Sequence, residues 1–418
     1  MLSQQFNQLI HDYRAVLFLT VCLAGQILAW RLWLRQAGSR PGLRRLIHGA
    51  FIIFNIGWAF TVFTLYHGRN LTDTFLTWVV RPSVSWQTVH LLVIVPAAAL
   101  GSLVLSGLRR LFRGRAAEGE GPADPGRRDF LVKAGAVGGL AVLGVSGYGV
   151  YRQGRSPALV RQTVLSPGLP SDLDGFVIAQ ITDVHLGLWA SQAELDQALA
   201  LLAAEKPDLA VFTGDLVDRD PEYARLYYEP LRHLADTPHG VWGILGNHDH
   251  YTGPEKITRL LDGNGLSMLV DRRVNLPNAP VTLIGLDDRG IHHNWMGADS
   301  PSLEDKEDPD VLDFKKVSGP PPRSGDFTIL LNHRPEGFRQ AAAHGCGLYL
   351  AGHTHGGQYQ LPGHDQLNLA GAFYKYTTGL YHEHGAHLYV SRGLAAVGIP
   401  FRLWAWPEVN LITLRAAP

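Results

Sequence analysis

The sequence contains little cysteine and little charge. Its 418 residues include only two cysteines, Cys22 and Cys346, so the chain cannot build a disulfide framework or a zinc site made of cysteines. Any metal must therefore be bound by histidine, aspartate, glutamate or asparagine. Charged residues make up 18% of the chain, which is low for a soluble protein, and the formal net charge is zero. A neutral chain gives no indication of nucleic-acid binding.

The shortage of charge is concentrated before residue 152, where four apolar stretches occur. A helix needs about 20 apolar residues to cross a bilayer. We therefore expect residues 1–152 to form an all-α transmembrane anchor region of about four helices, of which the last is short and rich in glycine. The expected spans cover about 13–34, 46–66, 85–108 and 134–151.

Basic residues in the loops predict the orientation of these spans. Arginines cluster between the first two spans and again between the last two, whereas the middle loop contains only Arg69 and Arg81. Because loops rich in arginine and lysine stay in the cytoplasm, everything after residue 152 is predicted to lie outside it. Residues 116–126, within the last basic loop, have the composition of a flexible cytoplasmic linker.

Residues 127–135 ("RRDFLVKAG") resemble the twin-arginine export signal of bacteria. Paired arginines precede a Phe-Leu pair, a lysine and a weakly apolar stretch. At this internal position the motif would act as an anchor and not as a cleaved leader. An ordinary basic flank before a helix is the alternative, and both interpretations place the C-terminal domain across the membrane.

Residues 155–418 are numerous enough for one large α/β domain. Short apolar runs typical of buried strands, such as 176–183, alternate with helical patterns. Ser191 and Glu194 are spaced as a capping box at the start of one such helix. Residues 287–325 are instead charged, rich in proline and loop-like, and we expect this insert to shape specificity.

Five motifs place polar side chains at or just past the ends of apolar runs, the edge at which α/β sheets bind ligands. They read "DVH", "GDLVD", "GNHD", "NHRPE" and "GHTH". In an extended segment residues i and i+2 point to the same side, so the D-x-H and H-x-H pairs can each reach one site. Histidine nitrogen and carboxylate oxygen without thiolate suit Mn, Fe or Zn. The candidate ligands are too many for one ion and suffice for two, a clamp suited to phosphoester hydrolysis.

In this order the motifs resemble the calcineurin-like metallophosphoesterases over roughly residues 174–415. The form "AGHTHGGQ", the C-terminal segment and the expected anchor resemble the YkuE-like, membrane-anchored branch of bacterial enzymes. The resemblance implies a four-layer α/β/β/α sandwich with a mixed pair of sheets. It also implies a hydrolase that acts on phosphoric ester bonds and uses two divalent metal ions.

The resemblance further implies roles for single residues. Asp215 would bridge the two ions, and His353 and His355 would bind different ions. His248 would contact the phosphate and protonate the leaving group, with Asp249 as the partner that orients it. Asp218 is a weaker candidate for support. The implied ligands are Asp183, His185, Asp215 and His355 for the first metal, and Asp215, Asn247, His333 and His353 for the second.

We therefore predict a multi-pass protein of the bacterial cytoplasmic membrane with its catalytic domain on the extracytoplasmic (periplasmic) side. It would cleave a phosphodiester or pyrophosphate bond through a hydroxide that bridges the metals. The substrate could be lipid-linked or derived from the envelope. The alternatives are a phosphomonoesterase of small soluble substrates, a non-catalytic binding or scaffold module that retains the fold, and a transporter or sensor.

Two further sets of residues have open roles. Trp189 and the C-terminal aromatic residues Phe401, Trp404 and Trp406 could be wall residues of the domain or an apolar rim that faces the bilayer. Three polar residues near the motifs could contact phosphate, namely Arg334, Gln358 and Arg392.

Overall fold

The computed structural model describes residues 157–187, 189–288, 312–397 and 402–417, together with Tyr148 and scattered residues between 26 and 56. The chain divides into two compact units, Met1–Val150 and Tyr151–Pro418. Most of the expected transmembrane region, the 116–126 linker and the 127–135 motif lie outside the described residues. In the part of the chain that is described, no helix is long and apolar enough to cross a membrane, so the all-α membrane region is not confirmed.

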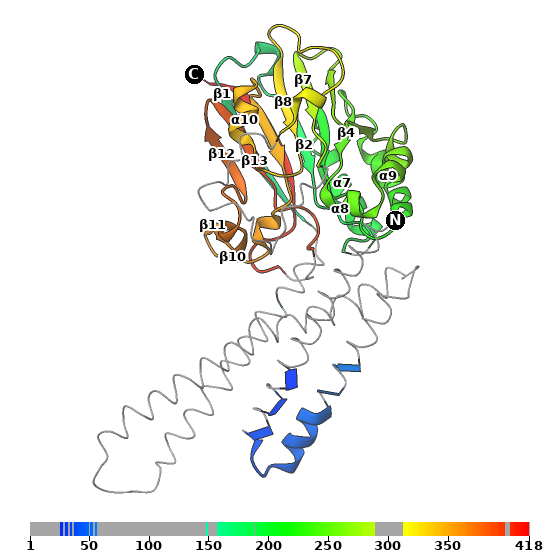
Figure 1. Cartoon of the computed structure of the whole chain (residues 1–418), viewed down its shortest axis with the longest axis vertical. Helices are drawn as coiled ribbons and strands as arrows, with labels where there is room; N and C mark the ends of the chain where they lie inside the picture. The colour runs from blue at the N-terminus through cyan, green and yellow to red at the C-terminus, as the bar shows by residue number, and fades with distance from the viewer. Residues whose placement is uncertain are drawn as a thin grey trace, which may run out of the picture. The chain divides into compact units, whose positions relative to one another are not determined.

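Two six-stranded sheets form the framework of the second unit (Figure 1). The first has the order β1-β14-β2-β3-β4-β5 and the second the order β12-β13-β9-β8-β7-β6. The first sheet consists of β1 (Ala158–Ser166), β14 (Glu408–Ala416), β2 (Val177–Ile181), β3 (Leu209–Thr213), β4 (Val241–Ile244) and β5 (Ser267–Met268). The second consists of β12 (Gly379–Glu383), β13 (Ala386–Val390), β9 (Leu348–Ala351), β8 (Phe327–Leu331), β7 (Val281–Gly285) and β6 (Arg272–Asn275).

Both sheets are mixed, as the resemblance implied. Strands β2 to β5 are parallel to one another, and β14 is antiparallel to β2. In the second sheet β13, β9, β8 and β7 are parallel, while the edge strands β12 and β6 are antiparallel to their neighbours. The carboxyl ends of the parallel strands therefore gather at a common edge in each sheet.

Three hydrophobic cores separate four layers. Helix α7 (Gln192–Ala203) packs on one face of the first sheet, and helix α10 (Phe338–Ala343) packs on the outer face of the second. The strands alternate their side chains between the cores: Ile329 and Leu331 of β8 pack between the two sheets, whereas Leu330 packs with α10. The layers thus follow the order helix, sheet, sheet, helix.

The helices between the strands follow local sequence signals. Ser191 caps α7 as expected, because its hydroxyl accepts from the Glu194 amide at 3.2 Å and its own amide donates to the Glu194 carboxylate at 2.7 Å. Residues 221–234 do not form one continuous helix. They form two 3₁₀ helices, η4 (Pro221–Tyr227) and η5 (Pro230–Leu234), since Pro230 has no amide hydrogen with which to continue a helix.

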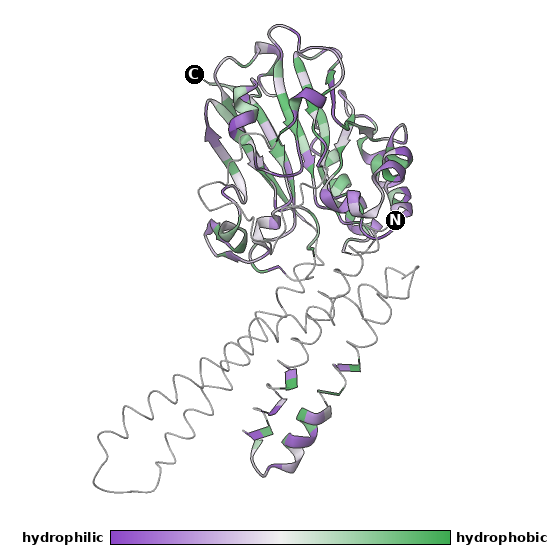
Figure 2. Cartoon of the chain, in the orientation of Figure 1, coloured by the Kyte–Doolittle hydropathy of each residue, from purple (hydrophilic) through white to green (hydrophobic). Residues whose placement is uncertain are grey.

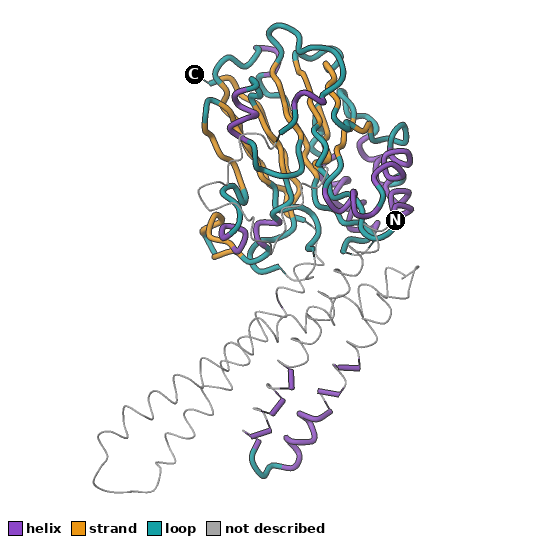
Figure 3. Tube along the Cα trace, in the orientation of Figure 1, coloured by secondary structure: helices purple, strands orange, loops and turns teal. Residues whose placement is uncertain are grey.

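Short elements complete the unit (Figure 3). Residues 312–325 of the predicted insert contain only η6 (Phe314–Lys316) as regular structure, and residues 289–311 lie outside the described part. The other short elements of the unit include η3 (Ser171–Leu173), α8 (Asn247–Thr252), α9 (Pro254–Leu261), η7 (His355–Gly357), β10 (Gln360–Leu361), β11 (His364–Asn368) and η8 (Leu369–Ala372).

Candidate metal centre

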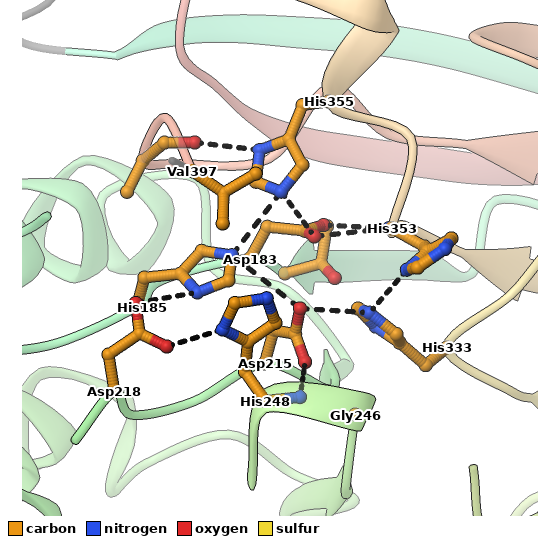
Figure 4. Close-up of polar contacts among 12 residues, drawn as sticks. Asp183, His185, Asp215, Asp218, Gly246, His248, His333, His353, His355 and Val397 are labelled. Atoms are coloured by element: carbon orange, nitrogen blue, oxygen red, sulfur yellow. Dashed lines mark hydrogen bonds and ion pairs between the residues drawn. The ribbon is translucent and has the colours of Figure 1, made fainter. Parts of the chain in front are cut away.

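The five sequence motifs meet where parallel strands end. Strands β2, β3 and β4 of the first sheet and β8 and β9 of the second each continue into one motif. Because the carboxyl ends of parallel strands share an edge, residues that are far apart in sequence lie side by side. Figure 4 shows the side chains of all five motifs facing one another.

A first group of ligand atoms comes from Asp183, His185, Asp215 and His355, and all of these atoms lie within 4.8 Å of one another. His355 Nε2 lies 3.2 Å from Asp183 Oδ1 and 3.3 Å from His185 Nε2. His185 Nε2 lies 3.5 Å from Asp215 Oδ2. All four residues are buried, so the atoms are held in place by the surrounding protein.

A second group comes from Asp215, His333 and His353. His333 Nε2 lies 3.1 Å from Asp215 Oδ2 and 3.3 Å from His353 Nδ1. Asp215 thus belongs to both groups, and His353 and His355 fall into different ones. This is the arrangement that the resemblance implied, although the role of these residues as metal ligands stays a prediction.

Two histidines have their tautomers set by backbone carbonyls. His333 Nδ1 lies 2.8 Å from the Thr213 carbonyl, and His355 Nδ1 lies 2.9 Å from the Ala395 carbonyl. Because a carbonyl oxygen only accepts, each Nδ1 donates a hydrogen and each Nε2 faces the site. A ring nitrogen with its lone pair towards a carboxylate oxygen is repulsive unless a proton or a metal cation lies between them. The donor set therefore fits divalent cations.

Asn247 supplies a second sign that the site fits a cation. Its Oδ1 atom is buried and has no hydrogen-bond partner among the described residues. A buried amide oxygen without a partner costs stability, and such exceptions usually have a functional reason. A hard cation beside Asp215 would satisfy this oxygen, and the amide of the next residue, His248, already donates to Asp215 Oδ1 at 2.8 Å.

The buried charges strongly perturb one another. Burial by itself would raise the pKa of Asp215, but the neighbouring His333 and His248 outweigh it and hold that pKa well below its ordinary value. Burial would lower the pKa of His333, yet Asp215 raises it to about 10. Burial is the main cause that holds the pKa of His353 well below its ordinary value, and the charge of Arg334 is the next, so this ring is neutral. Asp215 is therefore ionised and His353 neutral, the states in which these groups can bind a metal, whereas a metal bound by His333 must displace a proton from its ring.

His248 has a different partner from the one expected. Its Nδ1 atom lies 2.6 Å from Asp218 Oδ1, and its ring makes no hydrogen bond or ion pair with Asp249. The carboxylate of Asp249 instead accepts from the amides of Gly246 at 2.8 Å, Leu216 at 3.0 Å and Val217 at 3.0 Å. The expectation that Asp249 orients His248 is therefore wrong, because a carboxylate in the first turn of a helix turns back to cap that turn.

The surroundings of His248 favour its protonated form. Burial would lower its pKa, but Asp215 and the hydrogen bond to Asp218 raise it to about 9. The side chain is 29% exposed, whereas the side chains of His185 and His333 are fully buried. A substrate can therefore reach this ring.

The three candidate phosphate contacts have different surroundings. Arg334 Nε lies 2.9 Å from Asp288 Oδ2, and its Nη1 reaches within 2.8 Å of His353 Nε2 at the edge of the site. Gln358 exchanges two hydrogen bonds with the backbone of Val397, and Arg392 pairs with Glu408. Only Arg334 of the three adjoins the metal groups directly.

Arg402 is a residue of the site that the sequence analysis missed. It is fully buried, and its Nη2 atom lies 3.1 Å from His355 Nδ1 and donates to the same Ala395 carbonyl. Burial lowers its pKa to about 9. A single arginine just before Trp404 and Trp406 belongs to none of the five motifs, so no sequence signal could have placed it behind His355.

Glycines allow the loop after His355 to pack closely. Gly356 and Gly357 both have positive φ, at 56° and 64°. A Cβ atom on Gly357 would lie 2.5 Å from the Ala370 amide nitrogen, and one on Gly356 would lie 2.7 Å from Arg392 Cγ. Both positions therefore require glycine, for the backbone conformation and for space.

Comparison with known proteins agrees with the geometry. A family model described as calcineurin-like phosphoesterase matches residues 176–357. The uncharacterized metallophosphoesterase YkuE of Bacillus subtilis is 32% identical over 297 residues, which cover 69% of this chain and 98% of that protein. An uncharacterized metallophosphoesterase of Helicobacter pylori is 31% identical, with 66% of this chain and 68% of that protein covered. A Bos taurus protein, named transmembrane protein with metallophosphoesterase domain, is 29% identical, and the match covers 75% of this chain and 70% of that protein.

Proposed function

The chain belongs to the calcineurin-like metallophosphoesterase family and is a hydrolase of phosphoric esters, and we propose that it uses two divalent metal ions to cleave a phosphodiester or pyrophosphate bond. The observation that carries this proposal is the sharing of Asp215 by two groups of ligand atoms. One carboxylate between two sets of histidines is the arrangement that a pair of close cations needs.

Each ion would have its own ligands beside the shared Asp215. Cations bound there would supply charge neutralisation for the phosphoryl oxygens and activation of a water molecule. Mn, Fe and Zn all accept nitrogen and oxygen donors of these types. The proposed ligands are Asp183, His185 and His355 on one side, and Asn247, His333 and His353 on the other.

His248 is placed to serve the leaving group. Its Nδ1 faces Asp218 at 2.6 Å, so Nε2 is the nitrogen that remains for a substrate. A protonated Nε2 can first hold a phosphoryl oxygen and then donate its proton to the departing oxygen. Asp218 fixes the ring and stabilises its cationic form, while Asp249 supports the two loops that carry these residues.

We further propose that residues 1–152 anchor the enzyme in the bacterial cytoplasmic membrane, with residues 155–418 on the periplasmic side. The apolar stretches and the basic loops of the sequence support this placement, and a relative named as a transmembrane protein agrees with it. A lipid-linked or envelope-derived phosphoester is the substrate class that such an enzyme would meet. No observation on the described residues favours the scaffold alternative.

Metal analysis joined to an activity screen tests the proposal. The detergent-solubilised full chain is assayed for metal content and for hydrolysis of bis-p-nitrophenyl phosphate, p-nitrophenyl phosphate and a phospholipid. We expect about two ions per chain and faster cleavage of the diester than of the monoester. Asp215→Asn should remove both the metal and the activity, whereas Asp174→Asn, at an exposed ion pair with Arg415, should retain them. Full activity of Asp215→Asn would overturn the proposal.

A further inference from the structure

Exposed hydrophobic side chains gather on the loops beside the metal centre. They are Leu361, Leu367, Leu369, Phe373 and Trp404, between 38% and 59% exposed, and we refer to them as the apolar rim. Among the described residues of the second unit, the other exposed large hydrophobic residues are only Leu165 and Tyr251. The exposure is thus concentrated in one region of the domain and is not scattered over it.

Backbone hydrogen bonds join the segments of the apolar rim. Strands β10 and β11 pair with each other, and the Leu369 amide donates to the Tyr359 carbonyl at 3.1 Å. The Gln360 amide donates to the Leu403 carbonyl at 3.0 Å, which places Trp404 beside the same strand. Figures 1 and 2 show β10 and β11 at one end of the domain, with hydrophobic residues among the polar ones. The segments that carry the apolar rim are therefore joined to one another.

The apolar rim is built directly against the metal loop. Gly357 follows His355 by two residues, and a Cβ atom there would lie 2.7 Å from the Leu369 amide nitrogen. The turn that carries Leu369 thus touches the turn that carries His355. A molecule held at the apolar rim would therefore lie beside the loop that carries His355.

The same region is where the chain enters the domain. The Ala158 amide donates to the Pro407 carbonyl at 2.8 Å, and Ala158 is paired with Glu408. Pro407 is three residues from Trp404, a separation of at most about 11 Å. The last apolar stretch of the sequence ends at residue 151, so only a short tether separates it from Ala158. If that stretch spans the membrane, the apolar rim is kept near the bilayer surface.

The composition of the segment suits a lipid surface. From Tyr359 to Phe373 the chain contains a single carboxylate, that of Asp365, and no lysine or arginine. Soluble proteins seldom expose contiguous apolar surface unless it has a binding partner. Leucine and aromatic side chains at the level of the headgroups are typical of interfacial contacts.

We propose that the apolar rim rests in the headgroup region of the bilayer and holds the metal centre at the membrane surface. The proposal rests on the membrane anchoring proposed above. It assigns the lipid bilayer itself, and not a second protein, as the partner of Leu361, Leu367, Leu369, Phe373 and Trp404.

Quenching by brominated lipid acyl chains tests the contact directly. The full chain, with Cys22→Ser and Cys346→Ala, is reconstituted in lipid nanodiscs and carries a bimane label at Leu369→Cys. The control label is at Asp172→Cys in η3, which follows the far end of β1; a strand of nine residues separates the two ends by about 27 Å. We expect strong quenching at position 369 and little at position 172. Absent or equal quenching at the two positions would overturn the proposal.

Activity measurements separate this proposal from the proposed function. Leu367→Asp and Phe373→Asp should slow hydrolysis of a phospholipid in the nanodisc about tenfold. A carboxylate resists transfer from water into the bilayer, so each substitution should weaken binding of the apolar rim to the lipid surface by about that factor. Their hydrolysis of soluble bis-p-nitrophenyl phosphate should stay unchanged, as should both activities of Leu165→Asp. If neither the wild type nor any variant hydrolyses the phospholipid or bis-p-nitrophenyl phosphate, the proposed function fails. The quenching experiment still tests the apolar rim in that case. If quenching is absent and Leu367→Asp converts a dimer to a monomer by light scattering, the partner is a second copy.

Discussion

The carboxylate of Asp218 lies 2.6 Å from His248 Nδ1, although the two residues are 30 positions apart in sequence. The adjacent Asp249 uses its carboxylate to bind three backbone amides. The two carboxylates thus have separate tasks: Asp218 faces histidine rings, those of His248 and, at 3.3 Å, His185, whereas Asp249 holds loops together. Substitution of each should give different results.

Asp218→Asn should change the pH dependence of catalysis. The aspartate helps raise the pKa of His248 to about 9, and the protonated form is the one that can donate to a leaving group. With a lower pKa, the proton is lost at lower pH, so the alkaline limb of the pH–rate profile should move towards neutral pH. We expect kcat to fall about 10- to 100-fold for an alkyl leaving group.

The leaving group and a matched variant provide the controls. p-Nitrophenolate needs no proton to depart, so the bis-p-nitrophenyl phosphate rate of Asp218→Asn should fall much less. Asp220→Asn alters a carboxylate in the same loop that accepts from the Glu222 amide at 2.9 Å and not from the His248 ring. An alkaline limb that stays in place in Asp218→Asn would show that Asp218 does not control His248.

Asp249→Asn should act mainly on stability. An amide can replace one oxygen acceptor but presents an NH₂ group to donors, so at least one buried amide loses its partner. Each hydrogen bond to a charged group contributes about 1.5–3 kcal/mol. For a domain of this size the loss should lower the unfolding midpoint by about 3–12 °C. Thermal unfolding of the chelator-treated wild-type, Asp249→Asn and Asp218→Asn chains measures this loss. An unchanged midpoint in Asp249→Asn would contradict the role of Asp249 in holding the loops.

Asn247→Leu should separate metal binding from folding. The Oδ1 atom of Asn247 has no partner among the described residues, so its replacement by an apolar side chain of similar volume should be nearly neutral without metal. With Mn²⁺ present, the wild-type chain should gain stability by ligand binding and the variant should gain less. Unfolding midpoints with chelator and with Mn²⁺ test this, and Asn264→Ala, at an exposed asparagine, is the control. An equal metal-induced gain in both proteins would exclude Asn247 as a ligand.

Gly357→Ala should disturb the metal loop. The residue has a φ of 64°, and a Cβ atom would lie 2.5 Å from a backbone nitrogen that cannot move as a side chain can. The turn carrying His355 must therefore shift against η8, and we expect metal affinity to fall about tenfold or more. Gly363→Ala, which also has a positive φ but nothing within 4 Å of its Cβ position, controls for backbone strain alone. Similar metal affinity in the two variants would contradict this account.

Some elements of the domain were foreseeable and others were not. The buried parallel strands β2, β3, β8 and β9 form mostly apolar runs, so their positions follow from composition. Strand β1 was not foreseen, because its polar and apolar residues give an edge strand no clear pattern. Its partner, β14, begins 250 residues later at Glu408, and a pairing over that distance leaves no local signal.

The sequence by itself determined the chemistry available to the site. Aspartate, asparagine and histidine follow apolar runs in a fixed order, and the scarcity of cysteine leaves these residues as the ligands for a metal. Only the tertiary structure decided which side chains meet. It places the Asp218 carboxylate against His248, hydrogen-bonds the Asp249 carboxylate to backbone amides and places Arg402 behind His355. The reason is physical. The types of ligand depend on composition, whereas contacts between distant residues depend on how parallel strands are brought to one edge and on how their loops turn.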